Sequence, residues 1–199
     1  MSPDIAYLAM LFDAPLQSWG FDSRFQRRTT GLHPTKSGVI GLICAAMGLA
    51  KGSAEEEPTL PELAKLRMTG IAIPRQAGQA ASVSGLLPVR RLEDYHTVLE
   101  TRRASGTMSR DAVNTRRQYL LDARFGVILK GDHALLERVA AALQNPRWGV
   151  WFGRKSCIPA ASVFVALSQS QDEAWKAVLR ACRLDEGLPL EVFTVVTEV

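Results

Sequence analysis

The stretch Ile5–Phe12 (IAYLAMLF) decides the fold class of this 199-residue chain. It is a nearly continuous apolar run that begins just after Pro3, and a short run of this kind is typical of a strand in the middle of a sheet. The sheet must therefore be completed by strands that come later in the sequence.

The segments that follow Ile5–Phe12 alternate between helix and strand patterns. After a long loop, Thr35 fits the N-cap of an apolar, glycine-rich helix over 36–50. We expect the next elements to be a short helix at Leu60–Leu66, strands at Met68–Pro74 and Ala123–Lys130, an amphipathic helix at His133–Leu143 and a strand at Trp148–Phe152. The resulting order, β-α-β-β-α-β, is the ferredoxin-like pattern.

A short C-terminal extension follows this pattern. We expect a short strand near 162–167, a helix at Asp172–Cys182 and a last strand at Leu190–Thr197. The fold class is therefore α+β, with a ferredoxin-like unit formed by 1–75 and 119–199.

Residues 76–118 interrupt the pattern between two core strands. They are rich in glycine, serine, threonine and arginine and show little helical periodicity. Strands are expected near Ala81–Val89 and Tyr95–Thr101, with a tip around Ala104–Ser109. We interpret this segment as a long projecting insertion.

Positive charge is concentrated in separate parts of the chain. The net charge is +4, and arginine outnumbers lysine 18 to 6. Residues 23–54 contain five basic and no acidic side chains, and residues 138–171 contain four basic and none acidic. Arginine suits planar contacts to phosphate and stacking on bases, so a phosphate-binding groove and an ordinary solvated surface are both consistent with this pattern.

Composition also narrows the cellular setting. No uncharged apolar run approaches the roughly 18 residues that a membrane span needs, and the first ionisable side chain is Asp4 rather than a base. The three cysteines are far apart and odd in number, which favours a reducing cytoplasm over a disulfide framework.

Several motifs for catalysis or metal binding are incomplete. Thr30–Ser37 lacks both glycines of a P-loop. Free N–H groups at the helix start, beside Lys36 and Ser37, could still hold a phosphate, or the helix could be simply capped. No histidine has metal-ligand spacing to another ligand, so no metal or cofactor is expected. Trp19 is either a plug under the first loop or a stacking platform for a base.

Five strings in the same order resemble the CasD family, the RAMP-type subunits of type I-E CRISPR Cascade complexes. They are Pro15–Gly20 (PLQSWG), Pro34–Leu42 (PTKSGVIGL), Leu92–Val98 (LEDYHTV), Arg117–Ala123 (RQYLLDA) and Gly153–Pro159 (GRKSCIP). The resemblance implies a ferredoxin-like palm with a β-hairpin thumb at 76–118. It also implies a non-catalytic subunit that caps the backbone filament, grips the crRNA 5′ handle and contacts the large subunit, with target DNA reached only through the complex.

The expected RNA-binding residues come from three segments, which we expect to converge on one surface of a ferredoxin-like palm. Arg117 is the strongest choice, because it matches an arginine at the base of the thumb that the family uses on the handle. The full set is Gln17, Trp19, Arg24, Arg27, Arg28, Lys36, Ser37, Arg90, Arg91, Tyr95, His96, Arg102, Arg103, Arg116, Arg117, Arg154, Lys155 and Ser156. The alternative is a metal-independent endoribonuclease that processes repeat RNA, with Tyr95, His96 and Lys155 as candidate acid–base groups.

Overall fold

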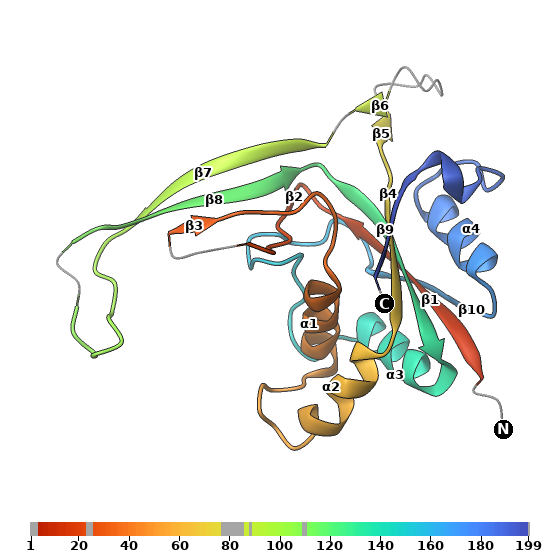
Figure 1. The fold of residues 1–199 in the computed structure, drawn as a ribbon, viewed down its shortest axis with the longest axis horizontal. Helices are drawn as coiled ribbons and strands as arrows, with labels where there is room; N and C mark the ends of the chain where they lie inside the picture. Colours follow the sequence, from red (N-terminus) through yellow and green to blue (C-terminus); the bar gives the residue numbers. More distant parts are fainter. Residues whose placement is uncertain (1–3, 23–25, 77–85, 88, 109–110, 199) are drawn as a thin grey trace.

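Five antiparallel strands form the central sheet of the computed structural model, which describes residues 4–22, 26–76, 86–87, 89–108 and 111–198. The strand order is β10-β1-β9-β4-β11, and every neighbouring pair is antiparallel. The strands are β1 (Ile5–Asp13), β4 (Arg67–Ala72), β9 (Arg124–Asp132), β10 (Phe164–Ser168) and β11 (Thr194–Glu198). The chain is therefore a mixed α+β protein, as the sequence predicts (Figure 1).

Helices cover both faces of this sheet. On one face lie α1 (Lys36–Met47), α2 (Glu56–Ala64) and α3 (His133–Gln144), and on the other lies α4 (Gln171–Ala181). The core strand and helix order from β1 to β10 is β-α-α-β-β-α-β, in which α2 is the short helix expected at 60–66, beginning earlier at Glu56 and ending at Ala64. A 3-10 turn, Leu190–Val192, precedes β11.

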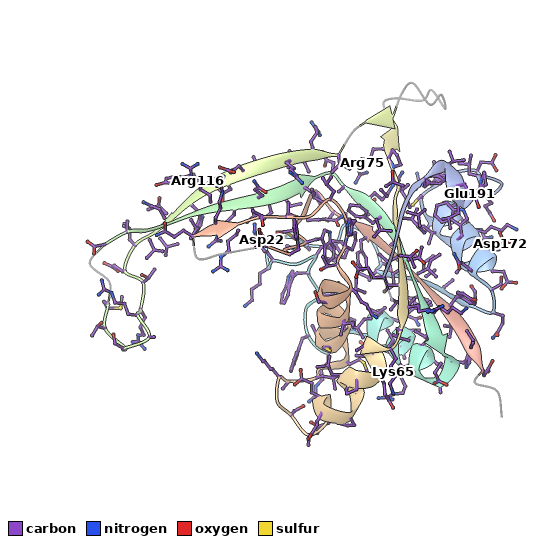
Figure 2. All side chains as sticks on the ribbon, in the orientation of Figure 1. Asp22, Lys65, Arg75, Arg116, Asp172 and Glu191 are labelled. Carbon is purple, nitrogen blue, oxygen red and sulfur yellow. The ribbon has the colours of Figure 1, made fainter. Side chains whose placement is uncertain are left out.

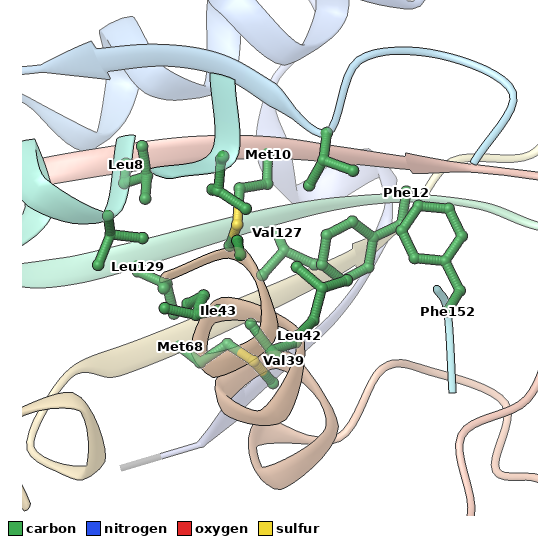
Figure 3. Close-up of a cluster of buried hydrophobic side chains, with 14 of the residues drawn as sticks. Leu8, Met10, Phe12, Val39, Leu42, Ile43, Met68, Val127, Leu129 and Phe152 are labelled. Carbon is green, nitrogen blue, oxygen red and sulfur yellow. The ribbon is translucent and has the colours of Figure 1, made fainter. Parts of the chain in front are cut away.

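The apolar run in β1 is continuous because both faces of this strand are buried. Leu8, Met10 and Phe12 pack into the cluster under α1 and α3, shown in Figure 3. The alternate residues Ala9 and Leu11 pack against α4 on the opposite face. A strand buried on both sides needs apolar side chains at successive positions, which is the pattern that Ile5–Phe12 shows.

The ends of α1 have specific caps. The side chain of Thr35 accepts a hydrogen bond from the backbone nitrogen of Gly38 at 3.3 Å. The helix ends at Met47, earlier than predicted, because Gly48 adopts a left-handed conformation (φ 74°) that stops it. In the first turn, a β-carbon at position 38 would lie 3.1 Å from the Trp19 ring, so the glycine lets the helix approach that ring closely.

A long hairpin extends from the sheet (Figure 1). Its strands β7 (Arg90–Val98) and β8 (Val113–Leu121) pair antiparallel along their whole length. Two short strands flank the other edge of β8: β2 (Leu16–Gln17) is antiparallel to it and β3 (Arg27–Arg28) is parallel. A further pair, β5 (Arg75–Gln76) and β6 (Leu86–Leu87), lies at the hairpin base.

The hairpin differs from its prediction in both of its long strands. The strand expected at 95–101 begins earlier, at Arg90, and ends at Val98. The strand expected at 81–89 falls mostly outside the described residues. The sequence analysis did not predict β8, whose middle (NTRRQ) carries no apolar alternation.

The strand predicted at Trp148–Phe152 is wrong, and β10 takes the place of the fourth strand beside β1. The backbone of Phe152 is bonded within loops, since its nitrogen donates to Cys157 O and its oxygen accepts from Ser18 N. Its ring is completely buried and stacks on Phe12 with 4.8 Å between ring centroids. The apolar character of this segment therefore reflects a packed loop.

Candidate nucleic-acid interface

Two arginine pairs meet where β3 lies alongside β8. In the parallel register, Arg27 lies beside Arg116 and Arg28 beside Arg117. The backbone nitrogen of Arg116 also donates to Gln26 O at 2.8 Å. Pairing of these two strands therefore brings the first basic segment of the chain onto the hairpin.

Arg154 connects a third basic segment to the same place. Its Nη1 donates to Gln118 O and its Nη2 to Arg28 O, both at 3.0 Å. The guanidinium carbon lies 4.6 Å from the centroid of the Tyr119 ring. One side chain thus links β3, β8 and the turn at 153–156, so the three segments predicted to converge do meet.

The turn that presents Arg154 depends on a glycine. Gly153 has a φ of 95°, and a β-carbon there would lie 1.8 Å from Ser18 O. Only glycine fits both the left-handed backbone and this close approach.

The side chains from these segments divide between two faces of the hairpin, because neighbours along a strand point to opposite sides. We call the first the Arg117 face and the second the Arg116 face. The registers place Arg28, Arg90, His96 and Arg117 on the Arg117 face, and Arg27, Arg91, Tyr95 and Arg116 on the Arg116 face. The expectation that all of them line one surface is therefore corrected.

The two faces differ in how their arginines are paired. On the Arg116 face, Arg116 Nη1 lies 3.6 Å from Glu93 Oε1, and Gln118 Nε2 donates to Glu93 Oε2 at 3.3 Å. On the Arg117 face, Arg117 Nε donates to the hydroxyl of Thr115 at 3.1 Å. Within the described part of the chain, neither Arg28 nor Arg117 forms an ion pair with a carboxylate. The acid on this face of β7 is Asp94, which lies opposite Arg117 and has its Oδ2 3.9 Å from His96 Nδ1.

A cavity of about 370 Å³ opens beside Arg28 and Arg154. The start of α1 forms another part of its wall, with Ser37 exposed to solvent. Its lining includes Gly20, Arg28, Thr29, Thr35, Ser37 and Arg154. Two guanidinium groups, the hydroxyls of serine and threonine side chains and the positive end of a helix dipole give this cavity the chemistry of an anion site.

The backbone nitrogen of Lys36 already has an anionic partner. It donates to Glu198 Oε2, from the end of β11, at 2.8 Å. Thr35 bonds the nitrogen of Gly38. The expectation of free N–H groups at Lys36 is therefore corrected, and Ser37 is the exposed group at this helix start.

Gln17 and Trp19 are structural in this fold, so we no longer assign them to RNA. Gln17 is completely buried, and its Nε2 donates to Phe12 O at 2.9 Å and to Ala123 O at 2.7 Å. Trp19 is 1% exposed and donates from Nε1 to Gln17 Oε1 at 3.0 Å. Trp19 is thus the plug under the first loop, with no free ring face for a base.

The remaining predicted residues lie further out. Lys155 and Ser156 are exposed, and Lys155 Nζ lies 5.9 Å from the Trp151 ring centroid. Near the hairpin tip, Arg102 forms an isolated β-bridge with Met108, and Arg103 Nη2 lies 3.9 Å from Asp111 Oδ2. Arg24 lies outside the described residues.

The acid–base set of the endoribonuclease alternative does not assemble on one face. Tyr95 and His96 are consecutive on β7 and point to opposite sides of the hairpin. His96 Nδ1 lies 3.9 Å from Asp94 Oδ2. Among the described residues there is also no group of three or more metal-ligating side chains.

Sequence reasoning missed some residues that build the site. Tyr119 provides the ring under Arg154, and Gly153 allows the turn. The string at 153–159 already indicates the basic turn in the sequence, but it does not indicate the close approach of Gly153 to Ser18 O. Nothing local in the sequence indicates that Tyr119 lies under Arg154, because that contact depends on the strand register.

A family model described as "CRISPR-associated protein (Cas_Cas5)" matches residues 7–192. The chain belongs to the Cas5 family of CRISPR-associated proteins. A relative in this family, the "CRISPR system Cascade subunit CasD" of Escherichia coli (strain K12), is 31% identical over 171 residues, which cover 84% of this chain and 73% of the relative. The resemblance to the CasD family is thereby confirmed.

Solved structures agree with this Cas5 assignment. A chain of a "CRISPR RNA-guided surveillance complex" superposes with a TM-score of 0.63 at 26% identity, covering 82% of this chain and 63% of that one. A structure described as "Crystal structure of Cas protein" gives 0.58 at 30% identity, with coverages of 85% and 69%. This Cas5 chain thus spans less than two thirds of the first of these.

In the described residues, no helix of this Cas5 protein has the length and apolarity to cross a bilayer.

Proposed function

We propose that this chain is a non-catalytic subunit of a type I-E-like Cascade surveillance complex in the cytoplasm. In this proposal it binds the 5′ handle of the crRNA, caps one end of the backbone filament and contacts the large subunit, so that it supports antiviral DNA targeting. Residues 1–75 and 119–199 serve as a ferredoxin-like RAMP palm and residues 76–118 as the thumb. Membership of the Cas5 family and the similarity to a chain of a surveillance complex support this proposal.

The observation that carries the RNA-binding role is the meeting of three basic segments at Arg28, Arg117 and Arg154. Arg154 fixes β3 and β8 together through two backbone carbonyls, and the cavity beside it adds hydroxyls and a helix start. Single-stranded RNA offers a flexible phosphate chain, which arginine binds through charge-assisted hydrogen bonds. We therefore assign the phosphate chain of the handle to the Arg117 face and this cavity.

Two matched double variants test this assignment. Arg28→Ala with Arg117→Ala removes two charges from the Arg117 face. Arg27→Ala with Arg116→Ala removes two charges from the same two strands on the other face. RNA affinity is measured with a repeat-derived single-stranded RNA over a range of salt concentrations.

The first double variant should lower RNA affinity and the second should lower it much less. Each lost charge-assisted contact costs roughly 1.5–3 kcal/mol, and the slope of log affinity against log salt should fall by about 0.7 per lost phosphate contact. The assembled complex should also retain less crRNA. Equal losses of RNA affinity in both double variants would contradict the assignment to one face. A wild-type affinity that does not depend on salt would overturn the proposed phosphate groove.

A further inference from the structure

A second cavity, of about 430 Å³, lies next to the anion cavity, and Thr35 lies in the wall of both. Its wall is built by the loop after β2, the loop before α1, the hairpin strand β7 and the end of β11. The side chains that line it include Phe21, Leu32, His33, Thr35, Arg91 and Glu198. We call it the Phe21 cavity.

Two large apolar side chains of this cavity are open to solvent. Phe21 is 72% exposed and Leu32 is 53% exposed. A β-carbon at Gly31 would lie 3.4 Å from Phe21 Cδ1, so the ring packs against the bare backbone of this glycine. The ring is therefore held from one side while its remaining surface faces solvent.

Arg91 adds a flat cationic group to the same cavity. It is exposed on β7, and its register opposite Leu120 places it on the Arg116 face. Aromatic rings and guanidinium planes are the groups on which proteins stack unpaired bases. Phe21 and Arg91 together thus offer stacking surfaces for a flat ligand.

Glu198 makes the Phe21 cavity unsuitable for phosphate. Its carboxylate already accepts the hydrogen bond from Lys36 N at the start of α1, so it occupies the position that an anion would take there. A second anion beside it would be repelled. The same carboxylate can accept hydrogen bonds from an exocyclic amino group, as acidic side chains do with cytosine.

We propose that the Phe21 cavity binds one unstacked, amino-bearing base of an RNA strand whose phosphates lie in the neighbouring anion cavity. Phe21 and Arg91 contact the faces of the base, and Glu198 accepts a hydrogen bond from its amino group. Adenine, cytosine or guanine would satisfy this contact, whereas uracil has no exocyclic amino group. This inference rests on the proposed RNA-binding function and adds to it a subsite with a base preference.

The test compares the binding of fluorescent oligo(A), oligo(C) and oligo(U) RNA to the 199-residue chain by anisotropy. The wild type should bind oligo(A) and oligo(C) roughly fivefold or more tightly than oligo(U). Phe21→Ala should weaken binding of all three roughly tenfold, and Phe21→Trp should retain it. Glu198→Gln keeps an oxygen for Lys36 N but adds a donor, so it should reduce the preference against oligo(U).

Matched controls separate these effects from general ones. Trp148→Ala removes an exposed aromatic ring near the opposite end of α1, where Trp148 N donates to Ala45 O. Glu191→Gln makes the same charge change as Glu198→Gln beside α4, in a different cavity. Neither control should alter the base preference.

The outcomes distinguish this inference from the proposed function. If Arg28→Ala with Arg117→Ala weakens binding while Phe21→Ala and Glu198→Gln leave affinity and base preference unchanged, the base subsite is wrong and RNA binding stands. If the wild-type chain binds none of the RNAs, both are overturned. Loss of affinity in Phe21→Ala together with a reduced preference in Glu198→Gln supports the subsite.

Discussion

Replacing Arg154 with lysine keeps a positive charge but removes the planar guanidinium that joins β3 to β8. The two guanidinium nitrogens each donate to a backbone carbonyl at 3.0 Å, and lysine can reach at most one of them. The lost hydrogen bond is partly exposed to solvent and contributes about 1 kcal/mol, and the stacking on Tyr119 contributes a further 0.5–1 kcal/mol or so. Arg154→Lys should therefore lower the free energy of unfolding by about 2 kcal/mol, and Arg154→Ala by about 3 kcal/mol.

Thermal unfolding followed by circular dichroism measures this effect. A chain of this length should lose roughly 4–8 °C in Tm for a loss of about 2 kcal/mol. Lys155→Ala is the matched control, because the neighbouring lysine is exposed and its Nζ lies 5.9 Å from the Trp151 ring centroid. Its stability should change by less than about 0.5 kcal/mol. A Tm for Arg154→Lys equal to that of Lys155→Ala would refute the linking role of the guanidinium.

Three further predictions concern stability and thiol chemistry. Gly153→Ala should lower the free energy of unfolding in urea severely, since the new β-carbon would overlap Ser18 O. Gly52→Ala, at a φ of 77° with nothing within 4 Å of the new β-carbon, should lower it by only about 1–2 kcal/mol, and similar losses for the two variants would contradict this. Gln17→Leu should cost roughly 3–5 kcal/mol by calorimetry, because it leaves three buried backbone and indole groups unpaired; a near-wild-type transition would refute this. Burial raises the pKa of the thiols of Cys44, Cys157 and Cys182, so the neutral thiols stabilise the folded state below the pKa of the unfolded thiols. This contribution to stability is lost as pH rises through the raised pKa values. Native protein should therefore react with a thiol reagent much more slowly than urea-unfolded protein, and equal rates would contradict burial of the three thiols.

Much of the sheet and its helices could be predicted from the sequence, because burial imposes a pattern there. β1 is apolar at successive positions since helices cover both of its faces, and α3 shows the apolar stripe of a helix packed on one side. The hairpin strand β8 could not be predicted, because most of its residues are half-buried and only Tyr119 and Leu120 near its end are buried, so burial imposes no alternation along it. The segment ending at Phe152 is misleading in the opposite way, since its apolar residues lie in a loop that buries the Phe152 ring and leaves Trp148 and Trp151 exposed.

For the candidate site, the sequence could predict where charge lies but not which polar side chains are packed inside the protein. The basic segments were predicted from charge, and the structure brings them together through β3, β8 and Arg154. Gln17 and Trp19 were assigned incorrectly because residue type alone does not show whether an amide or an indole points outward. One of the three hydrogen bonds of Gln17 reaches Ala123, far along the chain, and the other two join Phe12 and Trp19 only because the loop after β1 folds back on itself.

Doublets of arginine explain why charge counting could not locate the binding face. Three doublets, 27–28, 90–91 and 116–117, lie in extended strands, so each supplies one guanidinium to each side of the hairpin. The doublets therefore give both faces the same number of arginines, and β7 gives each face one acid, Glu93 or Asp94. The faces differ in how the arginines are held. Glu93 Oε1 lies 3.6 Å from Nη1 of Arg116, the hairpin residue labelled in Figure 2. On the other face, Asp94 lies near His96, Arg117 donates to the hydroxyl of Thr115, and Arg154 adds a guanidinium over Tyr119. Single substitutions of Arg116 and Arg117 are adjacent in sequence and identical in charge, yet they should differ in their effect on RNA affinity for this reason.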